Sequence, residues 1–212
     1  MMWLRENSCR MLRLIAVILL GSLISPAPEA LTNRANTFAS LLSPIPGQIQ
    51  LIIRKSRSDM TLYKGDTLIK SYQAVFGRGH RDGDKKRMGD KRTPEGEFYI
   101  CVMNHSKRFY RFMGISYPGL KHAEYGLRSG MISPAEYRTI KNAISDRLMP
   151  PWDTRLGGAV GIHGRTHDTE NPRERNDLAG VNWTDGCIAL DNADIDEIYA
   201  VVSLGTPVTI LP

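Results

Sequence analysis

Cysteine is scarce in this sequence: there are three in 212 residues, and Cys9 precedes an apolar run near the N-terminus. If that N-terminal region is removed, Cys101 and Cys187 remain, so at most one disulfide is possible. Internal repeats and low-complexity blocks are absent as well. The remaining chain, from about residue 31 onward, therefore suits one domain with a sizeable core.

The sequence also lacks an apolar run long enough for a comfortable membrane span, which needs roughly 20 residues. Its main run, 14–24, follows three arginines and leads into prolines and alanines. This order is typical of a secretory signal peptide. We therefore expect 1–30 to be a signal peptide or N-terminal membrane anchor, 31–47 a linker and 48–212 the folded domain. The protein is then exported to the periplasm or cell envelope.

Aromatic residues are missing from the most basic stretch of the chain, residues 77–92, which we call the basic loop. The formal net charge is +6, and much of it lies here. Single-stranded nucleic acid is bound by basic residues interleaved with aromatics. This stretch instead has four glycines and three aspartates. We expect a solvated surface loop and no nucleic-acid partner, with the anionic cell wall or lipid headgroups as candidate partners.

Strand patterns occupy much of the rest. Alternation begins at Ile49, a Lys-Gly-Asp turn divides the stretch 49–76, and another strand follows Gly96. A short strand, 207–210, ends the chain, and we place it at a sheet edge because Pro207 cannot donate a ladder hydrogen bond. The sequence predicts a mainly β domain with two or more helices.

The clearest helix covers residues 133–148. Ser133 caps it, Pro134 suits its first position and Glu136 completes a capping box. One face carries apolar residues at helical spacing, and we expect it to pack against the sheet: Tyr137, Ile140, Ile144 and Leu148. A last helix begins near Asp191, where an acidic residue favours the start of a helix.

Cys187 stands in an unusual place for a cysteine. It follows the turn residues Thr184, Asp185 and Gly186 and leads into an apolar segment. A buried cysteine usually lies inside an apolar run and behaves as a small hydrophobe. A thiol between a tight turn and a strand is fixed at one end and exposed at the other, as a nucleophile has to be.

His163 has the matching position for a base. It ends the short strand 159–162 and precedes Gly164, so its ring points at one rim of the sheet. If Cys187 starts the next strand at that rim, the base and nucleophile meet, as cysteine catalysis requires. The polar connection 165–183 is long for a compact domain, which is typical of a functional or disordered loop.

Together these residues resemble the YkuD-type L,D-transpeptidase catalytic domain family. His-Gly, a long loop and Thr-x-Gly-Cys-Ile match its motif, and "GDKRTPEGEFYI" is similar to its Gly-Asp…Thr-Pro-x-Gly-x-Phe element. "ISYPG" at 115–119 resembles a Ser-Tyr-Pro segment of one branch. The resemblance covers about residues 49–210 and implies a β-sandwich-like domain with the cysteine at the end of a cleft.

The resemblance also implies a reaction. Cys187 is then the nucleophile, His163 the base that activates it, and the carbonyl of Gly164 the group that orients the histidine. Backbone N–H groups of Asp185, Gly186 and Cys187 form the oxyanion hole, with Thr184 adjacent. We further expect His163 to hold the pKa of Cys187 below its ordinary value.

The implied substrate is a peptidoglycan tetrapeptide stem, which acylates the thiol, releases D-alanine and passes to an amine acceptor. A related cysteine hydrolase stays open, either an L,D-carboxypeptidase or an enzyme that releases a wall-bound protein. We expect stem peptides, and in the second case a wall-anchored protein, as partners. No cofactor or metal and a monomeric state are expected.

Two positions depart from the commoner family pattern, Ser-His-Gly-Cys-Ile-Arg. Asp185 replaces the histidine and Ala189 the arginine. Since a carboxylate facing the oxyanion hole is unfavourable, we expect Asp185 to turn away toward backbone N–H groups of the turn or toward a basic residue such as Arg165 or Arg173.

Other interpretations of the same residues compete with this one. A metal hydrolase would use His163 and His167, with Asp168 or Cys187 as further ligands, but the stretch lacks the helical glutamate of a zincin. A non-catalytic wall-binding module would explain the export signal and the basic loop without a Cys–His pair. Finally, Cys101 and Cys187 are either disulfide-bonded or two inert buried thiols.

Overall fold

The computed structural model of the chain describes residues 47–104, 106, 108–166 and 181–212. These residues belong to one compact unit, Pro44–Pro212. The predicted signal peptide or anchor and nearly all of the predicted linker lie outside the described residues and stay predictions. Among the described helices, none is long and apolar enough to cross a membrane.

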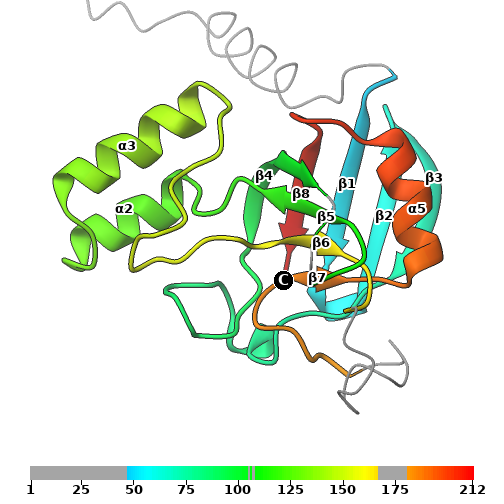
Figure 1. Cartoon of the computed structure of the whole chain (residues 1–212), viewed down its shortest axis with the longest axis horizontal. Helices are drawn as coiled ribbons and strands as arrows, with labels where there is room; N and C mark the ends of the chain where they lie inside the picture. The colour runs from blue at the N-terminus through cyan, green and yellow to red at the C-terminus, as the bar shows by residue number, and fades with distance from the viewer. Residues whose placement is uncertain (1–46, 105, 107, 167–180) are drawn as a thin grey trace, which may run out of the picture. The chain divides into compact units, whose positions relative to one another are not determined.

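One sheet of eight strands organises the described residues, in the order β3-β2-β1-β8-β4-β5-β6-β7 (Figure 1). The strands are β1 (Ile49–Arg54), β2 (Asp59–Lys64), β3 (Thr67–Gln73), β4 (Gly96–Asn104), β5 (Phe112–Ile115), β6 (Gly161–His163), β7 (Ile188–Ala189) and β8 (Pro207–Leu211). The sheet curls until its outer ends meet. Val75, just past β3, exchanges backbone hydrogen bonds of 3.0 and 2.9 Å with Ala189 of β7. The prediction of a mainly β domain is confirmed.

The main core lies between the strands and the helix α5 (Asn192–Val201). Every strand contributes a buried apolar side chain to it, and α5 adds Ile195 and Ile198, both fully buried. In β1 only alternate residues are buried, among them Leu51 and Ile53. Burying one such side chain contributes roughly 1.5–3 kcal/mol. The alternating pattern in the sequence therefore identified the core faces of the strands.

The prediction for the last strand is wrong. β8 lies in the middle of the sheet, parallel to β1 and antiparallel to β4. Pro207 is its first residue and pairs only at the end of the ladder, opposite Tyr99. A proline at the first position of a strand removes no interior ladder bond, so the following residues can be hydrogen-bonded on both sides.

Helix α3 (Pro134–Ser145) begins as the sequence predicts. The Ser133 side chain accepts a hydrogen bond of 3.2 Å from the Glu136 backbone N–H, and the Glu136 carboxylate accepts one of 2.7 Å from the Ser133 N–H. This reciprocal pair is the predicted capping box, which satisfies two backbone donors that the helix leaves free.

The apolar face of α3, however, packs against helix α2 (Leu120–Arg128) and not against the sheet. The two helices stand together beside the sheet, away from α5 (Figure 1). Leu148 lies beyond the end of α3 and is 60% exposed. A second small core joins the helices: Ala123, Ile132, Ile140 and Leu156. The sequence gives no clear signal for α2, because its buried residues His122, Ala123 and Gly126 form no large apolar stripe.

Candidate active site

The sheet brings His163 and Cys187 to the same face. β6 and β7 run parallel, with Ile162 opposite Ile188 and His163 opposite Ala189. Cys187 directly precedes β7, two residues before Ala189, and side chains two residues apart in a strand share a face. The alternate residues Ile162 and Ile188 point into the core. The core pattern of these two short strands thus turns the imidazole and the thiol together to the face of the sheet opposite the core.

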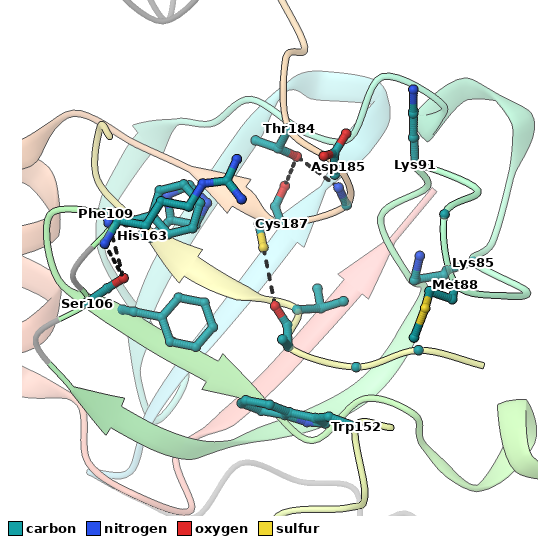
Figure 2. A pocket seen from close by; sticks show the side chains of 18 of the residues that line it. Lys85, Met88, Lys91, Ser106, Phe109, Trp152, His163, Thr184, Asp185 and Cys187 are labelled. Atoms are coloured by element: carbon teal, nitrogen blue, oxygen red, sulfur yellow. Dashed lines mark hydrogen bonds between the residues drawn. The ribbon is translucent and has the colours of Figure 1, made fainter. Parts of the chain in front are cut away.

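Both residues line a cleft of about 940 Å³ (Figure 2). Its other lining comes from the basic loop, from five described residues between Asn104 and Phe112, from residues 152–160 and from the turn 183–186. The cleft is thus assembled from segments that are distant in the sequence.

His163 is fully buried, and its environment defines its tautomer. Nδ1 lies 2.6 Å from the carbonyl oxygen of Gly164. A carbonyl oxygen can only accept, so Nδ1 carries the hydrogen and Nε2 of the neutral ring keeps its lone pair. Nε2 has no hydrogen-bond partner among the described residues. The ring stacks on Phe109 at 3.8 Å between centroids and meets the edge of Trp183 at 5.9 Å.

Cys187 is partly exposed in the cleft, and its Sγ lies 3.6 Å from the carbonyl oxygen of Ala159, to which it donates. Although one side of the residue opens to the cleft, the surrounding walls desolvate the sulfur and raise the pKa of Cys187 to about 11. A hydrogen bond from the Gly161 backbone and the charge of Lys85 oppose this rise only in part. The expectation of a lowered thiol pKa is therefore wrong.

Burial also lowers the pKa of His163, to about 4. At neutral pH the pair thus consists of a neutral thiol and a neutral imidazole. The thiol can give up its proton to Nε2 only as the bond to a substrate forms, which is general-base catalysis. Catalytic hydrogen bonds are often long or poorly aligned in free sites and tighten only with substrate, so the present Sγ–Ala159 contact is compatible with this exchange.

The turn before Cys187 requires glycine. Gly186 has φ +137°, and a Cβ there would lie 2.8 Å from the carbonyl oxygen of Arg92. Thr184 holds the turn: its hydroxyl accepts from the Gly186 N–H at 3.1 Å and donates to the Cys187 carbonyl at 2.7 Å. The Gly186 N–H is therefore already occupied, contrary to the expectation that it serves an oxyanion hole.

Asp185 does turn away from the thiol, but toward a different partner. Its carboxylate accepts a hydrogen bond from Arg78 of the basic loop. Arg165, one of the two expected partners, instead binds Asp191 at 2.7 Å, and Arg173 lies outside the described residues. Since Arg78 and Asp185 are both well exposed, their ion pair contributes little to stability.

The basic loop lies at the surface with many exposed residues, as predicted, but it also forms a wall of the cleft, which the sequence did not indicate. The Arg78 N–H donates to the Thr184 carbonyl at 3.0 Å, and the Gly77 N–H donates to the Thr93 hydroxyl at 3.0 Å. A Cβ on Gly77 would lie only 2.9 Å from Cα of Gly186. The loop and the turn thus touch backbone to backbone, which glycine at both positions permits.

Several residues of the cleft have no signal in the sequence. Phe109 reaches His163 only because β5 pairs with β6. Ala189 is fully buried against Val75, with Trp183 packed beside them, so this position adds no cation. The cations of the cleft come from elsewhere: Arg78, Lys85, Lys91 and Arg108.

The alternative roles find less support. Within the described part of the chain, no three His, Cys, Asp or Glu residues are grouped to hold a metal, and His167 and Asp168 lie outside it. Cys101 and Cys187 are both free, so the disulfide interpretation is wrong. Burial raises the pKa of Cys101 to about 12, as expected for an inert thiol in a strand.

The family model of the L,D-transpeptidase catalytic domain (YkuD) matches residues 48–210. The chain therefore belongs to this family, as the sequence motifs indicated. Among curated proteins, no sequence matches this one.

Solved structures include similar folds. The helical cell shape determining protein Pgp2 from Campylobacter jejuni is 18% identical, with a TM-score of 0.51, and the match covers 79% of this chain and 48% of that one. An L,D-transpeptidase from Mycobacterium smegmatis is 11% identical, with a TM-score of 0.46, over 78% of this chain and 59% of that one. The chain thus spans about half to three fifths of these proteins. At such identities the likeness concerns the fold.

Proposed function

We propose that this protein is a cysteine acyltransferase of peptidoglycan stem peptides. The observation that carries the proposal is the placement of Cys187 directly before β7, the strand that pairs with the strand of His163, whose Nδ1–H is donated to the Gly164 carbonyl. That bond leaves the Nε2 lone pair free to accept a proton. Family membership supports the choice of an L,D-transpeptidase reaction over other cysteine chemistry.

In the proposed reaction, Nε2 of His163 takes the thiol proton while Sγ of Cys187 bonds to the carbonyl carbon of the third stem residue. The carbonyl π electrons move to the oxygen and return as the C–N bond to D-alanine breaks. The departing amine takes the proton from His163, and a thioester remains. An acceptor amine then attacks the thioester, gives its proton to Nε2, and the thiol is regenerated.

We further propose that the reaction takes place outside the cytoplasm, at the cell envelope. The arginine-flanked apolar run near the N-terminus supports export, and stem peptides are found in the wall. The four cations of the cleft, set against the single carboxylate of Asp185, suit a peptide that carries carboxylates.

Mass spectrometry of muropeptides after incubation with the purified protein tests this function. We expect new cross-links between third residues and release of D-alanine, and neither product with Cys187→Ala. Shortened stems without cross-links would make the protein a carboxypeptidase, which overturns the transferase. Unchanged muropeptides with a folded protein would overturn the whole proposal.

A further inference from the structure

A buried ammonium group stands in the wall of the cleft. The side chain of Lys85 is 4% exposed, and its Nζ donates to the Asp90 carboxylate at 2.7 Å and to the Arg87 carbonyl at 3.2 Å. An ammonium has three donors; the third has no oxygen or nitrogen acceptor among the described residues, and the Tyr117 ring lies 5.9 Å from Nζ. Taking a lysine out of water is costly, which makes its position beside the cleft informative.

Lys85 borders the turn that carries the thiol. Its Nζ lies 3.8 Å from the point that a Cβ on Gly186 would occupy. Figure 2 shows Lys85 and His163 on opposite sides of Cys187. Acyl transfer uses a base on one side of the nucleophile and a positive or donor group on the other. The base passes the proton to the leaving group, while the carbonyl oxygen of the substrate faces the positive group.

The turn by itself offers an incomplete site for an oxyanion. The Gly186 N–H is bound to the Thr184 hydroxyl, so one of the expected backbone donors is already used. Negative charge that develops on a carbonyl oxygen needs preorganised donors or charges aimed at it. Among the cations that line the cleft, Lys85 is the one that is buried.

We propose that Lys85 is the cationic part of the oxyanion site and stabilises the negative oxygen formed when Cys187 attacks a carbonyl carbon. In that step the S–C bond forms, the carbonyl π pair moves to the oxygen facing Lys85, and the thiol proton goes to His163. When the pair returns, the leaving group departs with that proton. The inference rests on the proposed cysteine acyl transfer, but not on a particular substrate.

The other cations of the cleft are less suited to this task. Arg78 is 40% exposed and is bound by Asp185. Lys91 and Arg108 are exposed, so water and salt screen them. A charge in the low-dielectric wall acts more strongly on a nearby oxyanion than an exposed one does.

Two small reagents distinguish an effect of Lys85 on the oxyanion from an effect on the thiolate. Acylation by p-nitrophenyl acetate passes through a tetrahedral oxyanion, whereas iodoacetamide alkylates the same sulfur without forming one. Both rates would be measured on Cys187 by intact-protein mass, with Cys187→Ala as the blank. For Lys85→Met we expect acylation to fall at least about tenfold more than alkylation, in line with the loss of an oxyanion donor.

The matched control is Lys86→Met, which removes the same charge from the neighbouring residue. Lys86 is exposed and does not line the cleft. It should change both rates equally and slightly. Because Lys85→Met leaves the Asp90 carboxylate without its cation, Lys85→Met/Asp90→Asn removes both charges and should show the same selective loss, with circular dichroism as the check on folding.

An equal fall in acylation and alkylation would mean that Lys85 acts only on the thiol, and no fall would make it purely structural. Either result overturns the inference. The outcome is separate from that of the muropeptide assay. If acetylation depends on Lys85 while stem peptides remain unchanged, the proposed substrate fails and the role of Lys85 stands.

Discussion

Lowering the pH from 7 to 5 should destabilise this domain through His163. The ring is fully buried, and burial holds its pKa at about 4. In the unfolded chain the same imidazole takes up a proton near its ordinary pKa of about 6.5. Between these two values the unfolded state binds more protons than the folded state, so the free energy of unfolding falls as the pH is lowered.

The magnitude follows from the two pKa values. The gap between about 6.5 and about 4 corresponds to about 3 kcal/mol of unfolding free energy once the pH is below both. About 2 kcal/mol of this is lost between pH 7 and pH 5 by the same linkage relation. For a domain with a total stability of roughly 5–15 kcal/mol, the loss is easily measured.

The assay is urea unfolding at pH 7, 6 and 5, for the wild type and for His163→Asn. Asparagine keeps an N–H donor that can reach the Gly164 carbonyl but does not titrate. The variant is expected to be less stable throughout, yet to lose about 2 kcal/mol less than the wild type between pH 7 and 5. Burial also lowers the pKa of His80, and that contribution is common to both proteins. Equal losses in the two proteins would refute the buried neutral imidazole.

Three further predictions concern single residues. Cys187→Ala should abolish muropeptide modification while the circular dichroism spectrum is kept, whereas Cys101→Ser should stay active; equal inactivity of two folded variants would contradict these roles. Asp185→Asn should retain most muropeptide activity because it keeps an acceptor for Arg78, and Asp185→Ala should lose more. An inactive Asp185→Asn would show that the charge of Asp185 itself serves the thiol. Gly77→Ala should destabilise the domain by about 1–3 kcal/mol in urea unfolding, since the new methyl would overlap neighbouring backbone, and an unchanged midpoint would contradict the close contact of loop and turn.

The sequence by itself determined the features that depend on near neighbours. Alternation of apolar residues predicted the strands of the mainly β fold, and Ser133 with Glu136 predicted the start of α3. The turn before Cys187 and the glycine after His163 singled out two residues that the structure brings together, His163 at the end of β6 and Cys187 directly before the adjacent strand β7. These signals are local, because the period of a strand, the cap of a helix and the shape of a tight turn involve only a few consecutive residues.

Only the tertiary structure decided the features that depend on which surfaces meet. It placed β8 in the centre of the sheet, α3 on α2 and Arg78 against Asp185, a pair 107 residues apart in the chain. It also decided the protonation of the site, since the pKa values of His163 and Cys187 follow from how far each group is removed from water. The burial of Lys85 belongs to the same class. The sequence of a basic, glycine-rich stretch predicts a solvated loop and cannot show that one of its lysines is buried. Desolvation depends on the folded arrangement around a charged group and not on the identity of the residue that carries the charge.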